Sequence, residues 1–138
     1  TILLAPTFLT IFSPKRKPVL TSQFEVQRGM PTTLLVKYFE KNAEQWELKP
    51  EVRKLVNFKY FNLLENPGPL GRFDIVFCRN VLIYFDQQTK GKVLDGISKI
   101  MSDDGVLFLG GAETVLGVSD AFKAIPGQRG VYGLTRNG

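Results

Sequence analysis

Two short segments of the sequence carry polar side chains directly after stretches that are typical of strands. Asn62 follows the alternating run 56–61, and Arg79 and Asn80 interrupt an apolar run that begins at Phe73. In doubly wound α/β sheets the ligand lies beyond the carboxyl ends of the parallel strands, so these positions are candidates for ligand contact. Local pattern alone leaves two interpretations open, which are contact with a ligand, or a turn capped by Asn80 beside an ion pair of Arg79 with a carboxylate.

The composition excludes several kinds of active site. The 138 residues include no histidine and a single cysteine, Cys78. Histidine-dependent catalysis, histidine-based metal sites and multi-cysteine zinc sites are therefore excluded, and no metal is expected. Cys78 lies inside an apolar run without a visible activator, so we expect a core residue rather than a reactive thiol. A reducing, cytoplasmic setting fits this composition.

The charge pattern bears on the partners. The net charge is +5, from 18 basic and 13 acidic side chains that are scattered along the chain. Phosphate tracking needs a clustered basic face, so no nucleic-acid partner is expected, whereas an acidic protein partner fits. The apolar start, residues 1–12, is too short to span a bilayer and precedes basic residues, so neither membrane insertion nor a secretory signal is expected.

The elements that position Arg79 and Asn80 follow from periodicity. The run 73–78 is nearly all apolar, which is typical of a strand covered on both faces. An apolar stripe over 87–101 predicts a helix that Asp86 caps, and 106–109 predicts a second buried strand. Strand, helix and strand in this order predict a right-handed crossover between two parallel strands.

The flanking regions predict the rest of the fold. Helical spacing predicts a helix over about 32–42, and short strands are expected over 46–48 and 56–61 with a helical turn between them. Phe122–Ile125 and Val131–Leu134 predict a closing antiparallel hairpin. The fold class is therefore α/β, with parallel βαβ strands and a C-terminal antiparallel hairpin, as in Rossmann-like sheets.

Several blocks of sequence resemble the CheR family of chemotaxis receptor (protein-glutamate) O-methyltransferases. In chain order they are SQFEVQRGMP (22–31), FNLL (61–64), FDIVFCRNVLIYFD (73–86), DDGVLFLGGAET (103–114) and PGQRGVY (126–132). The resemblance implies the S-adenosylmethionine-dependent methyltransferase fold and methyl transfer to receptor glutamates, with S-adenosylhomocysteine as product. It also implies the cytoplasmic domain of a chemoreceptor as protein partner and substrate. We expect a monomer.

The resemblance also implies roles for five residues. Asn62 and Leu63 resemble the pair along the adenine end of the cofactor, and Arg79 and Asn80 resemble the pair that lines the cofactor cleft. Tyr84 resembles the tyrosine beside the transferable methyl group and is the predicted catalytic residue. Without the resemblance, Tyr84 would be interpreted as a core aromatic with its hydroxyl at the rim.

The resemblance implies that the chain is the C-terminal part of the methyltransferase. We expect 22–138 to be that part, including a small β-subdomain over about 43–60, and the proline-rich residues 1–21 to form an irregular arm. The glycine-rich turn and the acidic residue that binds the ribose have no match in 1–21. With the first strands missing, we expect an uncovered sheet edge and weak or no cofactor binding and activity by this chain alone.

Two other functions stay open. A non-catalytic module could hold a chemoreceptor or another acidic protein through the region around Trp46 or the basic surface. A nucleic-acid methyltransferase is the weaker alternative, since one fold serves many substrates but the scattered charge argues against it.

Overall fold

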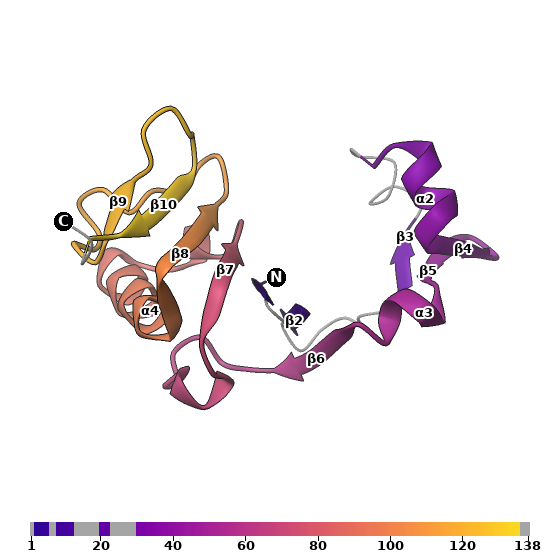
Figure 1. The fold of residues 1–138 in the computed structure, drawn as a ribbon, viewed down its shortest axis with the longest axis horizontal. Coiled ribbons are helices and arrows are strands. Elements are labelled where there is room, and N and C mark those ends of the chain that lie inside the picture. Colours follow the sequence, from indigo (N-terminus) through magenta and orange to yellow (C-terminus); the bar gives the residue numbers. More distant parts are fainter. Residues whose placement is uncertain (1, 6–7, 13–19, 23–29, 136–138) are drawn as a thin grey trace.

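Seven strands form one mixed sheet in the computed structural model, which describes residues 2–5, 8–12, 20–22 and 30–135 (Figure 1). The strand order is β6-β2-β1-β7-β8-β10-β9. The strands of this sheet are β1 (Ile2–Ala5), β2 (Phe8–Phe12), β6 (Val56–Tyr60), β7 (Phe73–Cys78), β8 (Met101–Leu109), β9 (Phe122–Ala124) and β10 (Val131–Leu134).

The crossover that positions the candidate residues is present as expected. Helix α4 (Gln87–Ile100) joins β7 to β8, which pair in parallel with Cys78 opposite Leu109. The Asp86 carboxylate accepts a hydrogen bond from the Thr89 N–H at 2.8 Å, which confirms the predicted cap. This bond lowers the pKa of Asp86. No helix in the described parts of the chain is long and apolar enough to cross a bilayer.

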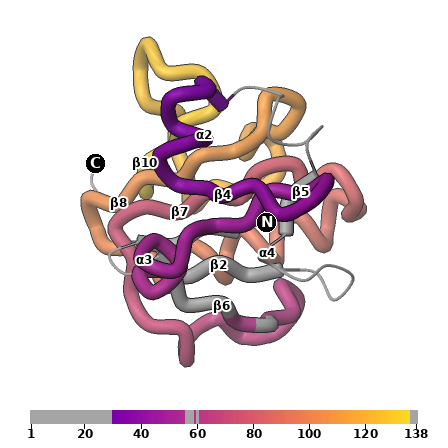
Figure 2. Tube along the Cα trace, turned by 90° about the vertical axis from the view of Figure 1, so that its right-hand side faces the viewer, coloured from indigo at the N-terminus to yellow at the C-terminus, as the bar shows by residue number. Residues whose placement is uncertain are grey.

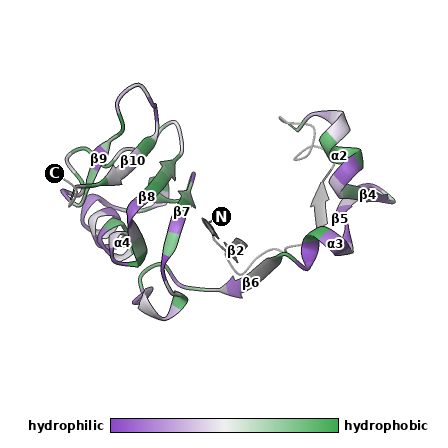
Figure 3. Cartoon of the chain, viewed as in Figure 1, coloured by the Kyte–Doolittle hydropathy of each residue, from purple (hydrophilic) through white to green (hydrophobic). Residues whose placement is uncertain are grey.

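The core lies between α4 and one face of β7 and β8. Val76 of β7 and Leu94 of α4 are fully buried there, and Figure 3 shows hydrophobic residues gathered in β8, β10 and the upper part of β7. On the opposite face Ile75 is 38% exposed, and Phe77 stacks on Phe108 with ring centroids 4.6 Å apart. The prediction that β7 is covered on both faces is therefore wrong for the described residues, because α4 covers one face alone.

The C-terminal hairpin is confirmed. Strands β9 and β10 pair antiparallel with Lys123 opposite Gly133, and β10 pairs antiparallel with β8 through Leu107 and Tyr132. Figure 2 shows β7, β8 and β10 in succession, as the pairing requires. The sheet therefore combines a parallel β7–β8 pair with an antiparallel edge, which is common in α/β folds.

The structure corrects the expectation of an irregular arm over residues 1–21. Strands β1 and β2 lie within the sheet, β1 antiparallel to β7 and β2 parallel to β6. In a doubly wound sheet of order 3-2-1-4-5, strands 2 and 1 lie between strands 3 and 4. Here β2 and β1 lie in the same way between β6 and β7. The apolar residue types of 2–5 and 8–12 suit such central positions. Among the described strands, β6 is therefore paired on one side with β2 and is an edge strand of the sheet, while β7 is paired on both sides.

A small three-stranded antiparallel sheet lies apart from the large one, as Figure 1 shows. Its order is β3-β5-β4, with α2 and α3 beside it. The elements are β3 (Leu20–Ser22), α2 (Thr32–Tyr38), β4 (Phe39–Asn42), β5 (Gln45–Leu48) and α3 (Pro50–Arg53). We call residues 30–53 together with β3 the small unit.

The borders of the small unit differ from those expected. Strand β6 belongs to the large sheet and β3 to the small one, so the expected region 43–60 does not coincide with the small sheet. The helix predicted over 32–42 ends at Tyr38, because Phe39 turns to extended backbone and begins β4. The turn expected after Pro50 is α3, and Trp46 is half-buried in the central strand β5.

Candidate functional site

Three strands of the large sheet end at the same edge. Strand β2 is parallel to β6, β1 is antiparallel to both β2 and β7, and β7 is parallel to β8. Strands β6, β7 and β8 therefore point the same way, and their following loops meet at one edge. We call this the carboxyl edge and define it by the loops 61–64, 79–84 and 110–113.

The loop after β7 turns sharply at Asn80, whose φ of 58° lies in the left-handed region. Asparagine tolerates this conformation better than most residues. Val81 returns to φ −119° and a short 3-10 turn, Leu82–Tyr84, follows. The backbone N–H groups of Asn80, Val81 and Leu82 consequently point toward a single acceptor, which is the concave arrangement that binds anions in proteins.

The acceptor is the carboxylate of Glu113, in the loop after β8. Its Oε2 accepts from the N–H groups of Asn80 at 2.8 Å and Gly110 at 2.7 Å, and its Oε1 from Val81 at 2.9 Å and Leu82 at 2.8 Å. Glu113 is 8% exposed. Burial raises its pKa, but the four hydrogen bonds outweigh burial and lower the pKa below the ordinary value, so Glu113 is ionised at neutral pH.

Gly110 allows the two loops to approach each other. A Cβ at this position would lie 2.5 Å from Asn80 Oδ1 and 2.7 Å from Glu113 Oε2, closer than real Cβ atoms come. At Gly111 a Cβ would meet nothing within 4 Å. The absence of a side chain is therefore required at Gly110 and not at its neighbour.

The loop 79–84 brings three predicted site residues together. The side chains of Arg79 and Asn80 are exposed, and Tyr84 is 81% exposed. Arg79 forms no ion pair with any residue that the structure describes, so the alternative of a carboxylate partner for Arg79 is not supported there. The three side chains offer a guanidinium group, an amide and a phenol ring to a ligand at the carboxyl edge.

Asn62 and Leu63 lie in the loop after β6. The exposed Asn62 accepts a hydrogen bond at Oδ1 from the Leu64 N–H at 3.1 Å, and Leu63 is half-buried against the core. Since β2 and β1 lie between β6 and β7, the two strands are about 14 Å apart at ordinary strand spacing. The structure thus places Asn62 and Leu63 at the same edge as Arg79, but on a separate loop.

Comparison with known proteins shows the family. Residues 17–131 match the family described as CheR methyltransferase, SAM binding domain. The chain belongs to the CheR family. It is 41% identical over 107 residues to a chemotaxis protein methyltransferase of Pseudomonas putida, covering 77% of this chain and 39% of the relative.

Other CheR relatives match in the same way. A chemotaxis protein methyltransferase of Pseudomonas aeruginosa is 38% identical over 105 residues, covering 75% of this chain and 38% of the relative. One from Vibrio anguillarum is 39% identical over 99 residues, covering 71% and 36% respectively. The chain thus spans about two fifths of the length of these relatives.

The carboxyl edge fits the cofactor of the CheR family. S-adenosylmethionine carries no phosphate, and the anion-binding N–H groups of Asn80, Val81 and Leu82 are already filled by Glu113. The loop 79–84 instead offers polar and aromatic side chains. The polar groups suit the hydrogen-bonding adenosine and amino-acid groups, and the aromatic ring suits a positively charged sulfur.

Glu113 is a residue that the sequence analysis does not single out. The signal is present in the sequence, because an acidic residue follows a buried strand at the carboxyl edge, as Arg79 and Asn80 follow the neighbouring strand. Gly110 has a packing role, since a side chain there would meet Asn80 and Glu113. Cys78 is fully buried as predicted; burial, and then the charge of Glu113, raises the pKa of its thiol to about 12.

Proposed function

We propose that this chain forms one side of the S-adenosylmethionine site of a methyltransferase that methylates glutamate side chains of chemoreceptors. The observation that carries the proposal is the loop 79–84, which presents Arg79, Asn80 and Tyr84 at the carboxyl edge on a backbone held by Glu113. Membership of the CheR family and the fit of this edge to a phosphate-free cofactor support it.

Each predicted residue has a chemical task in this proposal. The Asn62 amide and the Leu63 side chain contact the adenine end, by hydrogen bonding and by an apolar surface. Arg79 and Asn80 line the cleft and hydrogen-bond the polar groups of the cofactor. Tyr84 lies beside the methyl group, where its ring face attracts a neighbouring cation by about 0.5 to 2 kcal/mol.

When bound, S-adenosylmethionine would supply a methyl group on a positively charged sulfur; its transfer to a glutamate carboxylate would form the C–O bond of a methyl ester, break the methyl C–S bond and release S-adenosylhomocysteine. A glutamate carboxylate is ionised at neutral pH, so the residues of this chain need not remove a proton. Their contribution is to hold the two reactants in line, an effect worth about 7 to 11 kcal/mol in favourable systems. This requirement agrees with an edge that has fixed backbone and no histidine.

The test uses S-adenosylhomocysteine and two proteins. One is this chain, and the other, which we call the extended protein, carries the preceding portion of the Pseudomonas putida relative in place of residues 1–16, which include β1 and β2 and precede the family match. Isothermal titration should show binding to the extended protein and weak or no binding to the chain alone, because residues 1–21 contain no glycine and no acidic residue. A correctly folded extended protein that does not bind would refute the proposal.

Matched substitutions locate the site. In the extended protein, Arg79→Ala should weaken binding by about tenfold, as expected for loss of one hydrogen bond to a charged group. Arg72→Ala removes another exposed arginine, at the other end of β7, and should leave binding unchanged. Asn80→Gly removes the amide but keeps the left-handed backbone, so it tests the side chain without adding strain.

The small unit supports a receptor as the protein partner. Leu34 and Val36 of α2 are exposed apolar residues, and Lys37 of α2 and Lys41 of β4 are exposed basic residues of the same unit. A unit that exposes both apolar and basic groups fits an acidic protein. The second candidate function, a non-catalytic module, predicts that receptor binding persists while methyl transfer is absent in the wild-type extended protein. Tyr84→Phe and Asn80→Gly should then leave receptor binding unchanged.

A further inference from the structure

Glu113 connects two loops of the carboxyl edge through its carboxylate alone. Three of its four hydrogen bonds reach successive residues of the loop after β7, and the fourth reaches Gly110 at the end of β8. The first three of these bonds join residues that are 31 to 33 positions apart in the sequence. One side chain therefore fixes the loop that carries Arg79 and Asn80 relative to the neighbouring parallel strand.

The geometry requires an acceptor at both oxygens of the side chain. Oε2 receives the N–H groups of Asn80 and Gly110, and Oε1 those of Val81 and Leu82. A carboxylate accepts at both oxygens, whereas a glutamine of the same shape would turn an NH2 group toward one pair of N–H donors. Because Glu113 is 8% exposed, water has little access to replace the lost bonds.

The turn at Asn80 needs this support. Its φ of 58° costs a non-glycine residue about 1 to 2 kcal/mol, and its backbone N–H is one of the groups that Glu113 holds. A backbone in a sparsely populated conformation persists only where the surroundings fix it. The position of the Asn80 side chain, which lies over Gly110, depends on the same turn.

We propose that Glu113 is a positioning residue of the cofactor site, which places Arg79 and Asn80 for binding without touching the cofactor. The inference rests on the proposed function. It assigns to the 110–113 loop a role in cofactor affinity in addition to its role in packing. The carboxylate acts through the backbone of residues 80–82, so its loss should change affinity even where every ligand-contacting side chain is retained.

The first experiment needs no cofactor and uses the chain itself. Hydrogen exchange measured by NMR should show protected amides at residues 80–82 and 110 in the wild type. Glu113→Gln should lose this protection, while the amides of α4 keep theirs. Glu44→Gln makes the same chemical change at an exposed turn of the small unit and should alter none of these amides.

The second experiment measures affinity for S-adenosylhomocysteine in the extended protein, well below its melting temperature. Glu113→Gln should weaken binding by about tenfold or more, since it removes acceptors for charge-assisted bonds. Glu113→Asp keeps the carboxylate on a side chain that is one methylene shorter, and should recover part of the affinity. Glu44→Gln should bind like the wild type.

The outcomes separate the inference from the function on which it rests. Suppose that Glu113→Gln exposes the loop amides but binds S-adenosylhomocysteine as tightly as the wild type. This result would overturn the positioning role and leave the proposed function intact. Protection of the same amides in Glu113→Gln would overturn it as well. No binding by the wild-type extended protein would refute the proposed function and, with it, the inference.

Discussion

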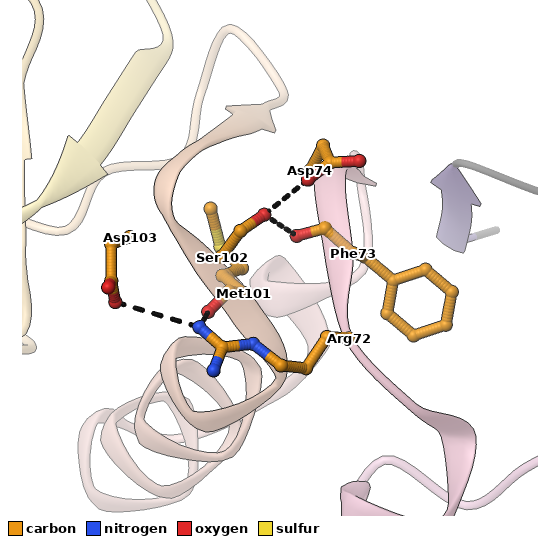
Figure 4. Close-up of polar contacts among 6 residues, drawn as sticks. All are labelled: Arg72, Phe73, Asp74, Met101, Ser102 and Asp103. Atoms are coloured by element: carbon orange, nitrogen blue, oxygen red, sulfur yellow. Dashed lines mark hydrogen bonds and ion pairs between the residues drawn. The ribbon is translucent and has the colours of Figure 1, made fainter.

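The two ends of the β7–β8 pair are held together in opposite ways. At the carboxyl end, the buried carboxylate of Glu113 accepts four backbone N–H groups from both loops. At the amino end, shown in Figure 4, the contacts involve Arg72, Ser102 and Asp103 on or near the surface. One pair of strands therefore has one end held by a buried side chain and one end held by contacts on or near the surface.

The amino end shows why its contacts are weaker. Phe73 pairs with Met101 but Ile75 with Val106, so the residues between Met101 and Val106 have no regular register. The Ser102 hydroxyl lies 3.0 Å from the Phe73 carbonyl oxygen and 2.5 Å from Asp74 Oδ1, and it has a single proton to donate.

The ion pair at this end is exposed. The Arg72 guanidinium lies 3.6 Å from Asp103 Oδ1, with side chains 67% and 73% exposed, and 3.4 Å from the Met101 carbonyl oxygen. Exposed pairs of this kind contribute little because solvent screens them. The difference indicates that a binding loop is best supported at the carboxyl end, where the backbone has no alternative partners.

The largest change in stability is expected from crowding the two loops at the carboxyl end. Gly110→Ala would place a Cβ 2.5 Å from Asn80 Oδ1, so we expect it to lower the free energy of unfolding by about 2 kcal/mol. Urea unfolding of the chain measures this value. Gly111→Ala is the matched control, since nothing lies within 4 Å there, and should change stability by less than about 0.5 kcal/mol. Equal effects at the two glycines would contradict the close approach of the loops.

Acid should loosen the carboxyl end, where the carboxylate of Glu113 accepts the hydrogen bonds of both loops. In the folded protein the pKa of Glu113 is lower than its ordinary value of 4.5. Between the folded and the ordinary pKa the unfolded state therefore binds more protons than the folded state. The contribution of Glu113 is therefore complete above about pH 5 and is lost as pH falls through the folded pKa. The effect should be smaller than that of Gly110→Ala, because a protonated carboxyl still accepts at its carbonyl oxygen.

The measurement for this prediction is the stability difference between the wild type and Glu113→Gln from pH 7 to pH 3. It should be constant at high pH and shrink in acid, where the wild type loses what the variant already lacks. A difference independent of pH would show that the carboxylate charge contributes nothing to the loop.

Sequence predicted the parts of the fold that depend on local pattern. The Asp86 cap and α4 were visible because their signals lie within a few residues, and β7 was visible as an apolar run. The strands β1 and β2 were not predicted, since Pro6, Pro14 and Pro18 of the same region argued against strands, while pairing with β6 and β7 depends on tertiary contacts.

The candidate site was predictable to a similar degree. Arg79 and Asn80 were singled out by their place after a strand, and the structure locates them on one exposed loop, while their role in ligand binding stays a prediction. Glu113 was missed because its partners are backbone N–H groups about thirty residues away, and sequence does not show which N–H groups converge. The left-handed turn at Asn80 was equally invisible, although asparagine is among the residues that favour it.

At the amino end, removal of one hydroxyl should have a modest effect. Ser102→Ala deletes one hydroxyl, whose single proton is shared between Phe73 and Asp74, so we expect a loss of about 1 kcal/mol in the free energy of unfolding. Urea unfolding at neutral pH measures it. Hydrogen exchange at residues 80–82 should stay as in the wild type, and a loss of protection there would show that the two ends are coupled.

The ion pair at the amino end should matter least. Arg72→Ala removes the partner of Asp103 from a surface where both side chains are mostly exposed, so the loss should be below about 0.5 kcal/mol. The difference from the wild type should shrink further when salt rises from 0.1 to 1 M, because ions screen exposed charges. A salt-independent loss comparable with that of Gly110→Ala would mean that Arg72 acts through its bond to the Met101 carbonyl. In that case the amino end would be fixed as firmly as the carboxyl end, and the contrast between them would not explain where the binding loop lies.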